Sequence, residues 1–189
     1  MGHHATDATA VEIASFLRSE IGKRGGNDPR EHWTVAVQFA LNDYKNTKPW
    51  PRSQVLPPPN EEDPSKGKKY PFLLDFVVWR RDFAGEKEGA RIACESEWNI
   101  SHASVIEDFH KLMSFKAPYK LMIYDGNGGD EKRTQLHQEF KKALSGFLWH
   151  VDDEIYIFLE FVKGNDIARI YTCRPKPAEE IRLLEIKST

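Results

Sequence analysis

The chain has few of the features that would place it in a membrane, outside the cell or among zinc proteins. Its longest apolar runs, such as IYIFLEFV at 155–162, are far shorter than the roughly 18 residues of a membrane-spanning helix. The first residues, MGHHATDATA, lack the apolar segment of a signal peptide. The two cysteines, Cys94 and Cys173, stand alone in apolar runs and match no zinc-ligand spacing. The sequence therefore favours a cytoplasmic protein without membrane contact, in which both thiols are free and buried.

The chain also has no large excess of positive or negative charge. The 27 Lys and Arg residues against 29 Asp and Glu residues give a net charge of −2. Any contact with nucleic acid would therefore depend on a local basic patch rather than on the overall charge. The length of 189 residues and the five Trp residues predict one domain spanning 1–189 with a substantial core.

The hydrophobic pattern switches repeatedly between helical and strand periodicity. Helices are predicted over 8–22, from Asp28 to about 46, over 102–116 and over 130–147, and strands over 70–79, 90–98, 119–126, 154–162 and 166–174. The tail 178–189 is typical of either a helix or a strand. Residues 47–69 contain six prolines and predict a loop with a short edge strand at 54–56, serving as a lid, a binding segment or an unstructured excursion. This order predicts an α/β domain with a mixed central sheet flanked by helices.

Acidic residues interrupt two of the apolar strands. Asp75 is the only charged residue in YPFLLDFVVW, and Glu95 and Glu97 lie within ARIACESEW. Because alternate side chains share one face of a strand, Glu95 and Glu97 project together. A symmetric hairpin between the two strands would place Asp75 opposite Glu95, with side chains about 5 Å apart, and Trp79 opposite Arg91.

A cluster of carboxylates on a half-buried surface requires a neutralising cation. Carboxylate oxygens suit Mg²⁺ or Mn²⁺, and such an ion activates water for attack on a phosphodiester. The simpler alternative is a set of cross-strand acids neutralised by Arg80, Arg81 or Arg91 at a sheet edge. By alternation, the side chains of Cys94 and Trp98, together with that of Ser96, point to the opposite face and belong to the core.

The spacing from Asp75 to Glu95-x-Glu97 resembles that of the PD-(D/E)xK, or restriction-endonuclease-like, nuclease superfamily. The residues that carry the resemblance are LLDF at 73–76 and CESEW at 94–98. The family core consists of a helix, a three-stranded meander, a helix and a further strand, which corresponds here to about 28–125. Residues 1–27 would then add an N-terminal helix, and 126–189 a C-terminal helix plus a hairpin. The resemblance implies metal-dependent hydrolysis of DNA.

The resemblance also implies roles for individual residues. Asp75 and Glu95 would bind the metal, helped by the backbone carbonyl of Ser96, and Glu97 would join them in catalysis. Position 97 is Glu where most members carry a Lys, although an E-x-E form occurs in the superfamily. The missing ammonium group would then come from Lys111 in the helix at 102–116.

Further candidates are weaker. Lys116 and Lys120 are other sources of an ammonium group, and Asp108 shares the polar helix face of Lys111. Glu31 corresponds to an acidic residue that many members carry on the first core helix, but a capping role beside Asp28 explains it equally well.

Two other functions stay open at this point. A catalytically inactive nuclease-fold protein, acting as a nucleic-acid-binding or assembly module, agrees with the absent Lys and the net charge of −2. A carboxylate pair also suits glycoside hydrolysis, although the chain shows no aromatic-rich sugar cleft. A homodimer would give a small nuclease two active sites, but no segment of the sequence indicates one.

Overall fold

The computed structural model describes residues 6–25, 31–48, 50, 53–56, 74–80, 89–99, 101–126, 128–150, 153–162, 167–175 and 182–184. These ranges contain four helices and seven strands. In chain order they are α1 (Asp7–Gly25), α2 (Glu31–Asn46), β1 (Ser53–Leu56), β2 (Phe76–Arg80), β3 (Gly89–Glu97), α3 (His102–Ser114), β4 (Tyr119–Asp125), α4 (Gly129–Gly146), β5 (Ile155–Val162), β6 (Ile167–Cys173) and β7 (Arg182–Leu184).

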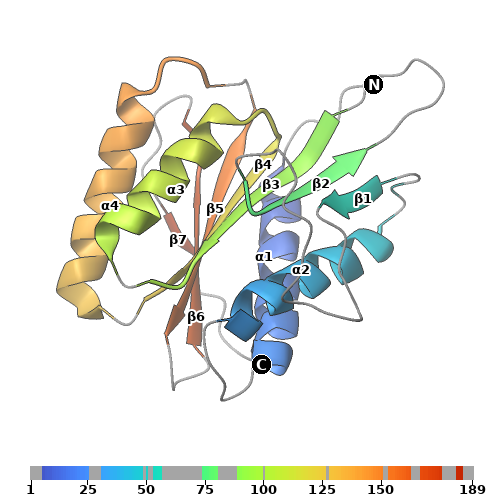
Figure 1. Ribbon diagram of the computed structural model, residues 1–189. Helices are drawn as coiled ribbons and strands as arrows, with labels where there is room; N and C mark the ends of the chain where they lie inside the picture. The colour runs from blue at the N-terminus through green and yellow to red at the C-terminus, as the bar shows by residue number, and fades with distance from the viewer. Residues whose placement is uncertain are drawn as a thin grey trace.

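The strands form one mixed sheet whose spatial order is the order of the chain (Figure 1). β1, β2 and β3 are an antiparallel meander, β3, β4 and β5 run parallel, and β6 and β7 return antiparallel. Parallel neighbours require a crossover, and α3 and α4 supply the two that are needed. Both helices lie on the same face because such crossovers are right-handed.

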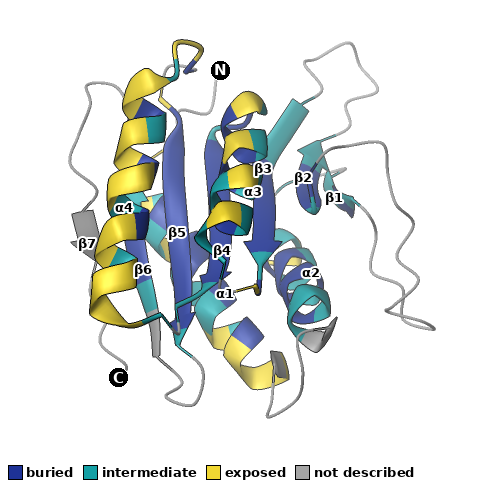
Figure 2. Cartoon of the chain, turned by 60° about the vertical axis from the view of Figure 1, so that its left-hand side comes forward, coloured by how far each residue is buried: buried dark blue, intermediate teal, exposed yellow. Residues whose placement is uncertain are grey.

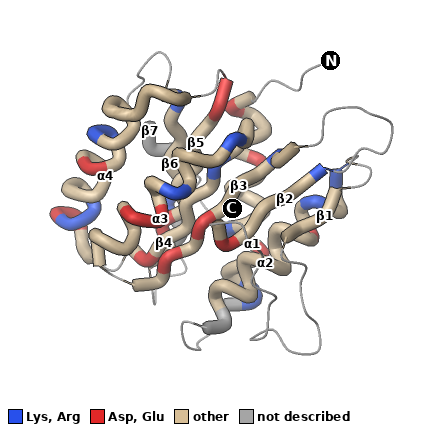
Figure 3. The backbone as a smooth tube through the Cα atoms, turned by 45° about the horizontal axis from the view of Figure 1, so that its top comes forward, with Lys and Arg blue, Asp and Glu red and all other residues tan. Residues whose placement is uncertain are grey.

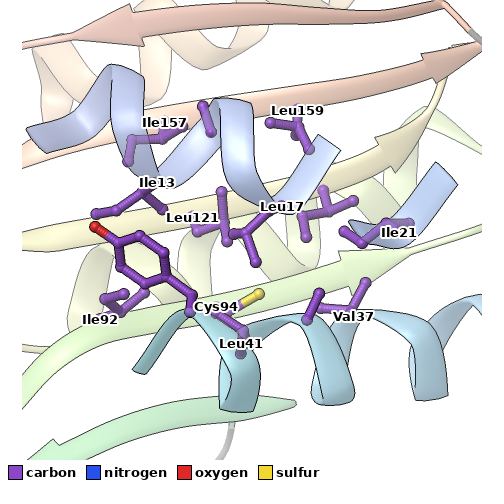
Figure 4. Close-up of a cluster of buried hydrophobic side chains, with 14 of the residues drawn as sticks. Ile13, Leu17, Ile21, Val37, Leu41, Ile92, Cys94, Leu121, Ile157 and Leu159 are labelled. Carbon is purple, nitrogen blue, oxygen red and sulfur yellow. The ribbon is translucent and has the colours of Figure 1, made fainter. Parts of the chain in front are cut away.

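The two faces of the sheet carry separate apolar cores. α1 and α2 cover one face, where Ile13, Leu17 and Leu41 meet strand residues such as Ile92 and Leu121 (Figure 4). α3 and α4 cover the other face, and each buries one stripe and exposes its outer side, as Figure 2 shows. The stripes repeat every three or four residues, which is the spacing that places side chains on one side of a helix.

The predicted α/β architecture with a mixed sheet and helices on both faces is therefore confirmed. The short edge strand at 54–56 is confirmed as part of β1, and the tail contributes the strand β7. Cys94 and Cys173 are free and buried, as predicted. Most of the proline-rich segment 47–69 lies outside the described residues. None of the described helices combines the length and the hydrophobicity needed to cross a bilayer.

The register between β2 and β3 decides where the acidic residues lie. Phe76 pairs with Cys94 and Val78 with Ile92, and continuing this register by one residue places Asp75 opposite Glu95, as predicted. The predicted pairing of Trp79 with Arg91 is wrong, because Trp79 pairs with Ala90. A β-bulge between Val78 and Trp79 leaves Arg91 as an extra residue on β3.

Candidate active site

Asp75 and Glu95 are held together by hydrogen bonds that involve the backbone. Asp75 directly precedes β2, and its amide donates to Glu95 Oε2 at 3.3 Å. In return, Asp75 Oδ2 accepts bonds from the amide of Ser96 at 2.9 Å and from the Ser96 hydroxyl at 3.0 Å. The start of β2 and the end of β3 therefore fix both carboxyl groups in position.

Glu95 is the most unusual group in this arrangement. Its side chain is almost fully buried, with 2% of the residue exposed, and Oε1 has no hydrogen-bond partner within the described part of the chain. Burial raises the pKa of Glu95 to about 9, and the negative charges of Asp75 and Asp108 contribute to the rise. A buried carboxyl with an unpaired oxygen is a place where a proton or a metal ion would be stabilised.

The pKa values of Asp75 and Glu97 are also raised. Burial raises the pKa of Asp75, while the two bonds from Ser96 oppose the shift. Burial also raises the pKa of the half-buried Glu97, and Asp108 and Asp75 add to this through their charge. Glu97 Oε1 accepts a bond from the amide of Asn99 at 2.6 Å, which holds the side chain at the end of β3.

α3 brings a further acid and a cation to the same place. Lys111 Nζ lies 2.6 Å from Asp108 Oδ1, one helical turn away. The bond to Asp108 raises the pKa of Lys111, and the charge of Lys111 in turn lowers the pKa of Glu95. Figure 3 shows the acidic positions of α3 and β3 on neighbouring elements. The charges of both Asp108 and Lys111 therefore act on Glu95, with opposite signs.

The remaining candidates are not brought to this cluster. Lys120 is buried and engages Glu154 at 2.7 Å, together with the carbonyl of Met113 and the hydroxyl of Tyr156. Lys116 is exposed in the connection between α3 and β4, where β4 begins, whereas Glu97 lies at the other end of these parallel strands. Glu31 begins α2, and its side chain lies outside the described residues.

Arg91, one of the arginines that could neutralise the acidic cluster, has another partner. The guanidinium of Arg91 lies 5.0 Å from the centre of the Trp50 ring, and desolvation by burial lowers its pKa. Arg91 is thus used in a cation–π contact, and among the described residues Lys111 is the cation whose charge lowers the pKa of Glu95. Arg81 lies outside the described residues.

The carboxylates of Asp75 and Glu95 could supply only part of the coordination shell of a metal ion. Among the described residues, no group of three or more His, Cys, Asp or Glu side chains is arranged to hold a metal ion by itself. Mg²⁺ in proteins often uses one or two carboxylates and completes its shell with water and substrate phosphate oxygens. Asp75 and Glu95, with the unpaired Oε1, fit this second kind of site.

Sequence reasoning missed the contact between the Ser96 hydroxyl and Asp75. Alternation assigns the Ser96 side chain to the opposite face from Glu95, so no contact with the acids is expected there. Asp75 precedes the strand, and from that position its carboxyl group reaches both the amide and the hydroxyl of Ser96.

Comparisons of the chain with protein-family models, with curated proteins and with solved structures find no match.

Proposed function

We propose that this protein is a metal-dependent endonuclease that hydrolyses phosphodiester bonds of DNA. The observation that carries the proposal is the convergence of Asp75 and the buried, unpaired Glu95 with Lys111 of α3. The order α2, β1, β2, β3, α3, β4 is also the element order of the PD-(D/E)xK core, which supports the same assignment.

Each residue has a defined part in this proposal. Asp75 and Glu95, with the backbone carbonyl of Ser96, would hold Mg²⁺ or Mn²⁺, which supplies activation of water and neutralisation of phosphate charge. Glu97, whose pKa is raised, is suited to accept a proton from the attacking water. The ammonium group of Lys111, fixed by Asp108, is suited to stabilise the negative charge that develops on the phosphate.

Plasmid cleavage in Mg²⁺ or Mn²⁺, with and without EDTA, tests the proposal. We expect Glu95→Ala to abolish cleavage and Lys111→Met to reduce its rate by about 10²–10³-fold, the usual cost of one preorganised group that stabilises charge. Glu139→Ala, on the exposed side of α4, is the matched control and should cleave as the wild type does.

Two results would contradict the proposal. Cleavage by Glu95→Ala at the wild-type rate would place the activity elsewhere. A folded wild type that cleaves in neither metal would favour the second candidate, a nuclease-fold module that binds nucleic acid without catalysis. The Glu at position 97, where the motif usually has Lys, is the observation that favours this second candidate.

A further inference from the structure

A pocket opens between α3 and α4, at the end of the sheet where Glu97 lies. It has a volume of about 330 Å³, counted together with the open solvent at its mouth. Its lining includes His102 of α3, Tyr124 and Gly126 at the end of β4, and Lys132 and Arg133 of α4.

The strand register places this pocket next to the acidic cluster. Glu97 pairs with Tyr124, and Tyr124 pairs with Glu160, so the three residues form a row across β3, β4 and β5. Paired residues of parallel strands project to the same face, and neighbouring strands are about 5 Å apart. The pocket therefore begins roughly 5 Å from Glu97 and extends to roughly 10 Å.

The floor of the pocket is built around a buried acid whose charge is balanced. Glu160 accepts bonds from Arg169 at 3.1 Å and from the Tyr171 hydroxyl at 3.0 Å, and Arg133 lies 3.9 Å away. Position 126 requires glycine, because a Cβ atom there would lie 2.3 Å from Glu160 Cγ. The negative charge of the floor is therefore already neutralised by the protein.

The rim, in contrast, carries donors that have no partner within the described part of the chain. Lys132 is exposed and its side chain lies across Gly128, while His102 is half-buried. Among the described residues, neither has a hydrogen-bond or ion-pair partner. Of the nearby acids, Asp130 pairs with the lining residue Arg133 at 2.7 Å, and the lining residue Asp125 has an interaction of its own.

We propose that the mouth of this pocket binds a backbone phosphate of the nucleic-acid strand that occupies the carboxylate site, with Lys132 and His102 as the donors. The inference rests on the proposed function and adds the path of the substrate across the protein. Phosphate oxygens are bound by cationic side chains and N–H donors, and such contacts position a strand without reading its sequence. With a rise of about 3.4 Å per nucleotide, a separation of 5–10 Å corresponds to about two or three nucleotides from the cleaved bond.

Binding of a fluorescently labelled 20-base-pair DNA duplex, measured by anisotropy in EDTA at several NaCl concentrations, tests the inference. We expect Lys132→Ala to weaken binding about 3- to 10-fold and to reduce the slope of log K against log salt by about 1. His102→Ala should also weaken binding, and Lys132→Arg should retain it. Lys142→Ala is the matched control, because Lys142 is exposed about 15 Å further along the same helix.

The outcomes separate this inference from the proposed function. If the wild type binds and cleaves DNA but Lys132→Ala binds with unchanged affinity and salt slope, the phosphate contact is wrong and the nuclease assignment stands. An equal loss in Lys142→Ala would show a diffuse charge effect and would also overturn the inference. If the wild type neither binds nor cleaves DNA, the proposed function fails, and the inference fails with it.

Discussion

Replacing Glu95 by glutamine is expected to stabilise the protein above neutral pH while it abolishes cleavage. Burial raises the pKa of Glu95 to about 9 from an ordinary value of 4.5. Between these two values the folded protein keeps a proton that the unfolded chain releases. The free energy of unfolding therefore falls as pH rises through this window, by up to ~1.4 kcal/mol per pH unit. Glutamine has nearly the same shape and cannot ionise, so this loss disappears in the variant.

Urea unfolding at several pH values between 5 and 9, without divalent metal, measures the effect. The variant should gain most over the wild type at the alkaline end. The pH dependence that remains should come from the other groups with shifted pKa values. Asp75, Glu97 and Glu160, whose pKa values are raised, lower the stability as pH rises, whereas His137, whose pKa is lowered to about 4 from 6.5, raises the stability between these two values. Glu139→Gln, at an exposed position, should leave the pH dependence unchanged. Identical pH profiles for the wild type and Glu95→Gln would show that Glu95 ionises normally in the folded protein.

Stabilisation of the folded protein by a divalent metal ion gives a second test of the role of Glu95. An ion that binds only the folded state stabilises it by an amount that grows with the logarithm of its concentration. Mn²⁺ should therefore raise the melting temperature of the wild type and leave that of Glu95→Gln nearly unchanged. A rise of equal size in both proteins would mean that the metal binds elsewhere.

The largest loss of stability is expected from removing one partner of the ion pair between Lys120 and Glu154. Each residue is only 1% exposed, and their charged atoms lie 2.7 Å apart. Lys120 also donates to the Tyr156 hydroxyl, and Glu154 contacts His150, so both charges belong to one buried network. Lys120→Met or Glu154→Leu alone would leave a buried charge without its partner, at a cost of about 3–5 kcal/mol.

A double-mutant cycle tests this prediction. We expect the combined variant Lys120→Met/Glu154→Leu to be more stable than either single variant, because it removes both charges from the interior. The wild type, both single variants and the double variant would be compared by chemical denaturation. Strictly additive losses would show that the two charges do not depend on each other. Folded Lys120→Met should retain cleavage, since the ammonium group is directed to Glu154 rather than to the acidic cluster.

Local patterns in the sequence were enough to predict the elements of this fold. Alternation and helical periodicity are properties of neighbouring residues, so the strands around Ile92 and Leu121 and the helix around Phe109 could be recognised from composition and spacing. The predicted symmetric register agrees with the observed one over Phe76–Val78, beside Asp75, and departs from it by one residue at Trp79 and Arg80, on the other side of the bulge.

The details that sequence reasoning missed depend on tertiary structure. The bulge beside Trp79 changes the register by one residue, and no feature of the local sequence signals it. The partner of Lys120 lies 34 positions away in the chain, so the lysine was as plausible in the cluster as in a buried pair. The effect of Lys111 on Glu95 depends on how α3 packs on the sheet. The sequence indicated a polar face on this helix, but it did not specify which residues of the sheet that face would meet.

The sheet order also has a consequence for the way the chain assembles. Each strand pairs with its neighbours in the sequence, so no pairing among the described strands requires the chain to close more than one connection or one helical crossover. α1 is the exception, because it precedes every strand and yet packs on β5 and β6. The amide of Thr6 also bonds to the hydroxyl of Tyr119, and Asp7 pairs with Arg174. During synthesis, the part of the apolar stripe of α1 that meets β5 and β6 therefore waits for the second half of the chain, and docking of this helix completes the domain.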